Sequence, residues 1–80
     1  MRINFNPYVL IYTDDTSIFD VHFIIIDKEE KTIDCCDEYG MSIAMIHYKD
    51  CEEVGYLKYN NKERFTGDVE IIIKNGKVVI

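Results

Sequence analysis

The side chains with the strongest coordinating chemistry in this chain are three cysteines and two histidines. One candidate set supplies three thiols and an imidazole, which zinc accepts as ligands: Cys35, Cys36, His47 and Cys51. Its spacing is poor, because zinc ligands usually come in pairs about two to four residues apart, and Cys35 and Cys36 are adjacent. We expect the thiols to fill small core positions instead. A metal-binding module is therefore the third hypothesis for function.

Catalytic chemistry has little support in the sequence. Neither His22 nor His47 lies in a motif that would place it beside a nucleophile. Paired carboxylates could serve as acid and base, but every pair falls in a predicted turn or at a strand end: Asp14-Asp15, Glu29-Glu30, Asp37-Glu38 and Glu52-Glu53. Solvated charge is the usual state there. We expect no enzymatic activity and no cofactor.

Negative charge is concentrated in the middle of the chain. Residues 14–53 hold twelve acidic and three basic side chains, a net charge of -9, whereas the formal charge of the whole chain is -6. Nucleic-acid binding depends on clustered Lys and Arg, so we expect no direct contact with nucleic acid. An acidic surface attracts basic partners.

These observations predict a small acidic protein-binding module, an inhibitor that docks on a basic surface of a larger partner. Such a surface would normally bind nucleic acid, with carboxylates replacing phosphates. Phage-encoded anti-defence proteins such as anti-CRISPRs share this size and charge, as an analogy of type without a matching motif. The predicted contact residues are acids of the middle segment and two tyrosines suited to interfaces: Asp34, Asp37, Glu38, Tyr39, Asp50, Glu52, Glu53 and Tyr59.

The elements that must position these residues are mostly strands. A strand is predicted over Tyr8–Tyr12, with Pro7 marking a break before it, and the longest strand over Ile18–Ile26. The latter would turn one apolar face to the core: Phe19, Val21, Phe23 and Ile25. In a partner strand over Thr32–Cys36, Ile33 and Cys35 would be packed, while Asp34 and Cys36 would face outward.

Two hairpins are predicted near the C-terminus. Asn75-Gly76 is typical of a two-residue turn that pairs Lys74 with Lys77, Ile73 with Val78 and Ile71 with Ile80. One apolar face would then hold Val69, Ile71, Ile73, Val78 and Ile80. The second hairpin, Tyr56–Tyr59 with Lys62–Phe65, would pair Tyr56 with Phe65 and Lys58 with Glu63.

The segment before that hairpin fits two structures. Apolar residues recur at helical spacing and allow a helix near residues 42–53. As a strand, Ser42–Tyr48 is apolar on both faces and would be central. We favour the strand, because Glu52 and Glu53 would sit at the negative end of the helix dipole.

Together the elements predict one domain over residues 1–80, mainly β, an antiparallel meander closed as a barrel or folded as a two-layer sandwich. The alternative is an α+β domain with the helix packed on the sheet. A structural subunit whose strand edges pair between copies, for example as a homodimer, is the second hypothesis for function. The sequence holds no secretory signal or membrane span, and an odd number of cysteines fits a reducing cytoplasm.

Overall fold

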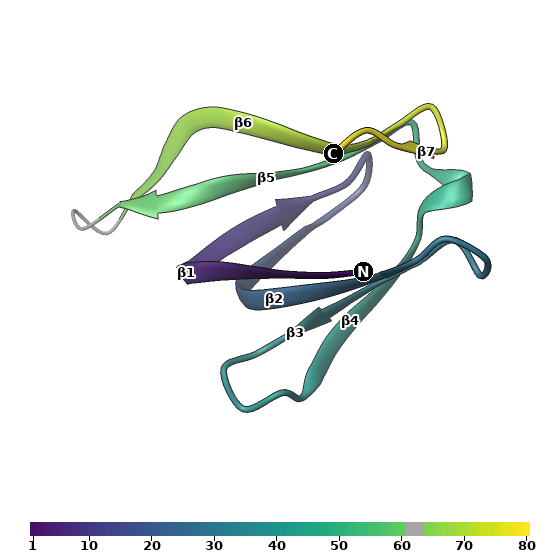
Figure 1. The fold of residues 1–80 in the computed structure, drawn as a ribbon. Coiled ribbons are helices and arrows are strands. Elements are labelled where there is room, and N and C mark those ends of the chain that lie inside the picture. Colours follow the sequence, from purple (N-terminus) through teal and green to yellow (C-terminus); the bar gives the residue numbers. More distant parts are fainter. Residues whose placement is uncertain (61–63) are drawn as a thin grey trace.

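The protein is mainly β, as predicted. The computed structural model describes residues 1–60 and 64–80, with side chains described for 1–59 and 68–80. The elements are β1 (Arg2–Tyr12), β2 (Ser17–Asp27), β3 (Thr32–Cys36), β4 (Ser42–His47), the 3₁₀ turn η1 (Tyr48–Asp50), β5 (Glu53–Asn60), β6 (Arg64–Lys74) and β7 (Lys77–Val78) (Figure 1). No helix in the described ranges is long and apolar enough to cross a membrane.

The described strands form one antiparallel sheet in the order β4-β3-β2-β1-β5-β6-β7. Neighbours in sequence are neighbours in the sheet, except that the chain passes from the β4 edge to β5, which pairs with β1. The sheet is not closed as a barrel. Instead β5, β6 and β7 lie over the part formed by β1 to β4 (Figure 1).

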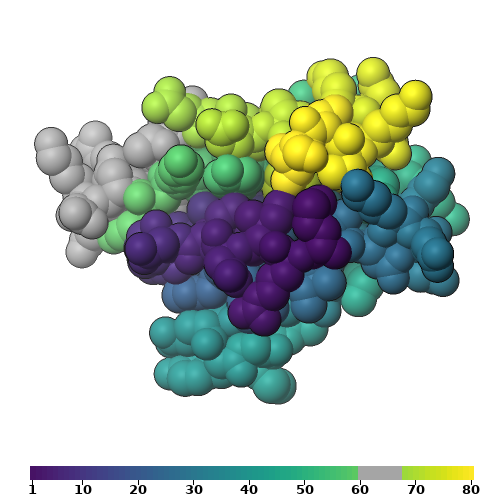
Figure 2. All heavy atoms as spheres, viewed as in Figure 1, coloured from purple at the N-terminus to yellow at the C-terminus, as the bar shows by residue number. Residues whose placement is uncertain are grey.

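Strand β1 is the centre of this arrangement. Val9, Leu10 and Ile11 are all buried, because the strand is apolar on both of its faces and has a neighbour on each side. We call the strands on one side of β1 (β2, β3 and β4) and those on the other side (β5, β6 and β7) the two wings of the sheet. In the space-filling view β1, in purple, lies between them (Figure 2). Pro7 does not end the strand, but the register with β2 shifts between Asn4 and Val9.

The core contains residues from both wings. Ile24 and Ile33 from one wing, and Val54, Ile72 and Ile73 from the other, are fully buried in one cluster. Burial of this apolar surface is the main stabilising force for so small a domain. The two wings therefore fold as a unit around β1.

The predicted core face of β2 is partly wrong. Phe19 is 56% exposed and Ile25 is 41% exposed. Ile24 and Ile26, which alternation places on the face opposite to the predicted core face, are buried. Asp20 adopts a φ of 58°, in the left-handed region, which interrupts the alternation of the strand between Phe19 and the later residues. Val21 and Phe23 are buried as predicted, and the reversal from Ile24 onward follows the register shift at which Asn4 pairs with Phe23 and Val9 with Val21.

The C-terminal hairpin forms as predicted at its turn. Asn75 and Gly76 have φ values of 52° and 76°, and Lys74 pairs with Lys77 and Ile73 with Val78. The pairing of Ile71 with Ile80 is wrong, because β7 ends at Val78. The single apolar face is also wrong, since Val69 and Ile80 are exposed.

A bulge explains why adjacent residues of β6 share the core. Val54 pairs with Ile73 and Gly55 with Ile71, so Ile72 is an extra residue on β6. Ile72 and Ile73 are both 0% exposed. Sequence alternation alone places them on opposite faces.

The register of the preceding hairpin also differs from the prediction. Tyr56 pairs with Glu70, and Phe65 pairs with Tyr59 instead. The predicted partner of Lys58, Glu63, lies outside the described residues. Phe65 is therefore paired three residues farther along β5 than the residue pattern indicates.

The ambiguous segment is a strand, and the helix near residues 42–53 is wrong. Strand β4 is not central, however, but forms one edge of the sheet. Its apolar outer side chains are accordingly exposed: Met41 by 65%, Ile43 by 43% and Met45 by 52%. The chain then passes through η1, where Tyr48 is buried, into β5.

Candidate protein-binding site

The four residues of the zinc hypothesis do not converge. Cys35 and Cys36 are buried, His47 is exposed at the end of β4, and Cys51 follows η1. Among the residues that the structure describes, no group of three or more His, Cys, Asp or Glu side chains could hold a metal ion. The expectation that Cys36 would face solvent is wrong, because it is only 2% exposed beside Phe23, its partner on β2.

The thiols are poor nucleophiles. All three are free. Burial, with the nearby Asp34 carboxylate, raises the pKa of Cys35 to about 12, and the same causes raise the pKa of Cys36. The pKa of Cys51 is raised by burial and then by Asp14. Thiols with raised pKa values stay protonated at neutral pH, and only the thiolate is reactive.

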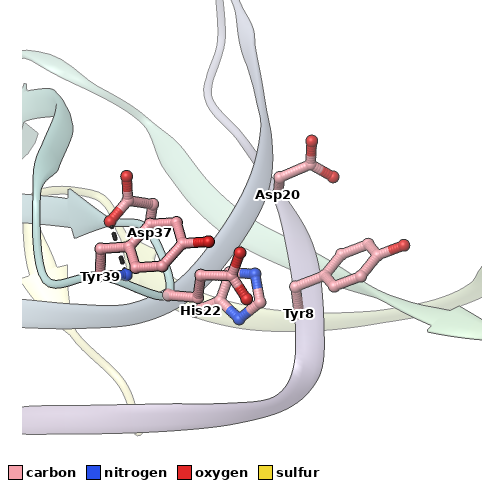
Figure 3. Close-up of a pocket in the computed structure, with 6 residues that line it drawn as sticks. Tyr8, Asp20, His22, Asp37 and Tyr39 are labelled. Carbon is pink, nitrogen blue, oxygen red and sulfur yellow. Dashed lines mark hydrogen bonds between the residues drawn. The ribbon is translucent and has the colours of Figure 1, made fainter.

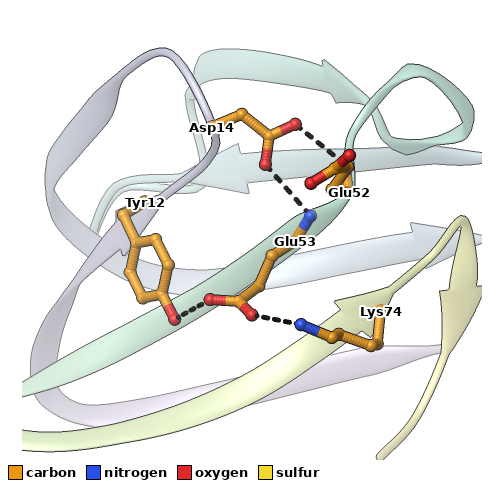
Figure 4. Close-up of polar contacts among 5 residues, drawn as sticks. All are labelled: Tyr12, Asp14, Glu52, Glu53 and Lys74. Carbon is orange, nitrogen blue, oxygen red and sulfur yellow. Dashed lines mark hydrogen bonds and ion pairs between the residues drawn. The ribbon is translucent and has the colours of Figure 1, made fainter.

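The predicted acidic surface is divided into two groups at different places on the sheet. We call the first group the clamp; it consists of Tyr12, Asp14, Glu52, Glu53 and Lys74 (Figure 4). Asp14, in the β1–β2 turn, accepts hydrogen bonds from the backbone N–H groups of Glu52 (2.8 Å) and Glu53 (3.1 Å). The turn after β1 is thereby joined to the start of β5.

The carboxylate of Glu53 completes the clamp. It accepts a hydrogen bond from the Tyr12 hydroxyl at 3.0 Å and another from the Lys74 ammonium at 2.9 Å, which link β1, β5 and β6. Both bonds hold the pKa of Glu53 below its usual value, and the bond from Lys74 is the larger cause. Burial, followed by the bond to Glu53, raises the pKa of Tyr12 to about 12. Glu53 was predicted to bind a partner, but its side chain is committed within the chain.

The other acids of that end stay close to the clamp. Glu52 is exposed and contributes its backbone N–H, while its carbonyl accepts a hydrogen bond from Asn75 N–H at 2.7 Å. Asp50 is exposed on η1, and its charge contributes to the raised pKa of Cys51. These residues belong to the structural joint between the two wings.

The second group surrounds an open hollow of about 380 Å³, which we call the hollow. It is lined by Tyr8 from β1, Asp20 and His22 from β2, and three residues that follow β3: Asp37, Glu38 and Tyr39 (Figure 3). Three of these side chains are carboxylates, and none of the lining residues that the structure describes is a lysine or an arginine. The hollow therefore favours a cation.

Asp37 builds the turn that presents Tyr39. Its Oδ1 accepts hydrogen bonds from the N–H groups of Tyr39 and Met41, both at 2.9 Å. Gly40 N–H donates to Asp37 O at 3.1 Å, and Gly40 has a φ of 84° that other residues adopt only with strain. On this fixed turn the Tyr39 ring is 82% exposed. An exposed tyrosine on a fixed turn is accessible to a partner, and tyrosine is enriched in binding hot spots.

Aromatic packing forms another wall of the hollow. The Tyr8 ring lies 5.4 Å from the His22 ring and 4.7 Å from the Tyr59 ring, centroid to centroid. Tyr59, a predicted contact residue, thus reaches the hollow through Tyr8. Tyr8 is half-buried, because its ring packs at the rim of the hollow.

Of the eight predicted contact residues, the structure brings Asp37, Glu38 and Tyr39 together and places Tyr59 against Tyr8, on another wall of the hollow. Asp34 lies apart on β3, where it accepts a hydrogen bond from the Ser42 hydroxyl. Sequence reasoning missed three lining residues: Tyr8, Asp20 and His22. No local motif marks them, because they meet the turn only through the pairing of β1, β2 and β3.

No protein-family model matches the sequence, and neither a curated protein nor a solved structure shows significant similarity to it.

Proposed function

We propose that this chain is a non-enzymatic protein-binding module whose hollow receives an arginine or lysine side chain of a larger basic partner. The observation that carries the proposal is the Tyr39 ring, 82% exposed on a turn fixed by Asp37. Aromatic residues presented in this way are typical of binding hot spots.

The chemistry of the hollow suits a guanidinium or ammonium group. A cation over the face of Tyr39 gains a cation–π interaction, and the carboxylates of Asp20, Asp37 and Glu38 offer charge-assisted hydrogen bonds. Both backbone bonds to Asp37 use Oδ1. Within the described part of the chain, no bond is assigned to its Oδ2, which faces the ligand in this proposal.

Surfaces that bind nucleic acid present clustered arginine and lysine, and they are the partners that this proposal favours. By covering such a surface the module would act as an inhibitor, in the manner of phage anti-defence proteins. The three cysteines are free, and their thiols are buried or have raised pKa values, which supports a reducing compartment, the cytoplasm. The protonated thiols and the open shape of the hollow support binding rather than catalysis.

The test measures binding of an oligoarginine peptide by titration calorimetry. Glu38→Lys should weaken binding about tenfold, because it places a cation where the peptide's cation binds. Tyr39→Ala should weaken it several-fold without changing the charge of the chain. Duplex DNA and the module should compete for the same basic surface of the natural partner.

The matched control is Glu30→Lys, an exposed acid in the turn between β2 and β3. Glu30→Lys and Glu38→Lys change the net charge equally, so a difference between them reports the site and not the overall field. Equal weakening by both variants, with no effect of Tyr39→Ala, would refute the proposal. Binding through the hollow should also weaken as salt shortens the screening length from ~10 Å at 0.1 M to ~3 Å at 1 M.

A further inference from the structure

The β4 edge of the sheet is open to another strand. Among the described strands, β4 (six residues) pairs only with β3, so one side of its backbone presents N–H and C=O groups without a strand partner. Such an edge is a template for pairing with another chain. Proteins usually protect it with charge, proline, a bulge or a very short strand. Of these devices β4 has a bulge at Ile43, since Ala44 pairs with Cys35 and Ser42 with Cys36.

The two edges of the sheet are treated differently. At the far edge, β7 is two residues long, begins with Lys77 and pairs only with Ile73 and Lys74 of β6. The uncovered remainder of β6 carries charged residues, among them Asp68 and Glu70. By contrast, β4 lies in a long run without a charged residue, residues 39–48. The one longer run of this kind, residues 3–13, covers most of the central strand β1. An uncharged run is expected where strands pair on both sides. On β4 one of those sides is unoccupied in the single chain.

The outer face of β4 carries two exposed apolar side chains, with Asp34 of β3 beside them. Ile43 and Met45 point outward, while Ala44 and Ile46 alternate toward the core. Met45 pairs with Asp34, which pairs with Ile25, so an exposed Ile25 lies two strands away in the same row. Hydrophobic side chains at an open edge supply burial in addition to backbone hydrogen bonds.

We propose that two copies of this chain pair through their β4 strands, antiparallel about a two-fold axis, into one continuous sheet. Side chains that face each other across an antiparallel ladder share a face, so the register must match outer residues with outer residues. A register centred on Ala44 does this: Ile43 of each copy lies opposite Met45 of the other. Four apolar side chains then cover one another on the outer face.

The charges at the ends of β4 favour this direction. Asp37 and Glu38 precede the strand, and Lys49 follows it on η1. Antiparallel pairing places the acidic turn of each copy near Lys49 of the other, whereas parallel pairing would set acid beside acid. In the register centred on Ala44, Lys49 lies level with Tyr39 and Asp50 level with Glu38, so Asp50 offsets part of this attraction. The uncharged strand keeps other like charges of the two acidic chains away from the contact.

The assembly closes at two copies. A two-fold contact uses the same edge of both chains. The remaining outer edges are the two-residue β7 and the part of β6 that β7 does not cover, which carries the charges of Asp68 and Glu70. Growth into a filament would require a long unprotected edge at each end. The proposal is therefore a dimer.

Sedimentation equilibrium of the unliganded chain tests the dimer. The weight-average mass should rise with concentration from 9.4 kDa and level off at twice that value. A mass that stays at 9.4 kDa up to about 1 mM would overturn the proposal. Continued growth beyond two copies would overturn it as well.

Two matched variants locate the contact. Met45→Lys should raise the dissociation constant about tenfold or more, because a lysine on an edge strand opposes pairing. Val79→Lys, next to the β7 edge, is the control, since Val79 is 53% exposed and Met45 is 52% exposed. An equal effect of the two variants would place the contact elsewhere and refute the β4 interface.

A charge exchange tests the direction. Glu38→Lys and Lys49→Glu should each weaken the dimer several-fold, and the double variant should recover most of the loss, because it restores the opposite pair across the interface. Failure of the double variant to recover would exclude antiparallel pairing. The readout is the mass of the chain alone, so it is independent of peptide binding at the hollow.

Discussion

The clamp and the hollow are built from the same types of residue, tyrosines and carboxylates, yet they do opposite things. In the clamp, the Glu53 carboxylate accepts hydrogen bonds from the Tyr12 hydroxyl and the Lys74 ammonium. In the hollow, three carboxylates line an open space beside a tyrosine that is 82% exposed. Similar residue types therefore form both clusters, and the two differ in whether each polar group has its hydrogen-bond partners within the chain.

The largest expected difference between the two regions comes from their glycines. A Cβ at Gly55 would stand 2.5 Å from the Tyr12 hydroxyl oxygen and 2.8 Å from the Glu70 carbonyl oxygen, on the paired strand. Gly55→Ala should therefore lower the free energy of unfolding by about 2 kcal/mol, through overpacking and the disturbed clamp. Urea denaturation measures the change.

Gly40→Ala in the turn of the hollow is the comparison variant. Nothing lies within 4 Å of its Cβ, so only the φ of 84° penalises the alanine, at a cost of about 1 kcal/mol. If the two alanines destabilise equally, the close approach at Gly55 has no energetic consequence and the contrast between the regions fails.

A smaller effect is expected at Tyr12. Tyr12→Phe removes the hydrogen bond to Glu53 and should cost about 1 kcal/mol at neutral pH. The folded chain raises the pKa of Tyr12 from 10.0 to about 12, so this stabilisation is complete below pH 10.0 and is lost as the pH rises towards 12. The gap in unfolding free energy between the native chain and the variant should narrow over that range.

Denaturation midpoints of both proteins, collected at a series of alkaline pH values, provide the measurement. Subtracting one from the other removes the titration of groups that the two proteins share. A gap that stays constant to pH 12 would show that the Tyr12 hydroxyl is not coupled to the fold.

The smallest effect on stability is expected at Tyr39. Because its ring is largely in solvent, Tyr39→Ala should change the unfolding free energy by less than about 0.5 kcal/mol. Thermal unfolding checks this value beside the peptide titration of the same variant. A destabilisation as large as that of Tyr12→Phe would mean that the Tyr39 ring supports the fold, contrary to its assignment as a binding residue.

Local chemistry explains which parts of the fold were predictable. Asn75-Gly76 specifies its turn through residues that accept positive φ, and the register of the adjacent pair Lys74 and Lys77 follows from the turn. The faces of β2 and β6 were mispredicted for a different reason. The irregular backbone at Asp20 and the bulge at Ile72 shift the alternation, and neither residue type announces this.

Only one wall of the hollow was predictable from the sequence. Asp37, Glu38 and Tyr39 adjoin one another in sequence, and aspartate followed by glycine indicates a turn. The opposite wall requires Tyr8 of β1 to meet His22 of β2 after the register shift between Asn4 and Val9. Likewise Glu53 could not be separated from free surface acids, because its partners Tyr12 and Lys74 lie far away in the chain.

The central position of β1 also sets an order of events during folding. Its first neighbour, β2, follows at once in the chain, but its second neighbour, β5, begins only at Glu53. A nascent chain can thus build β1 to β4 while the other side of β1 is still without its strand. Leu10 pairs with Leu57 only after most of the chain has been synthesised. A chain synthesised only as far as β4 would leave one side of the Val9–Ile11 run of β1 unpaired, an edge of the kind that promotes aggregation.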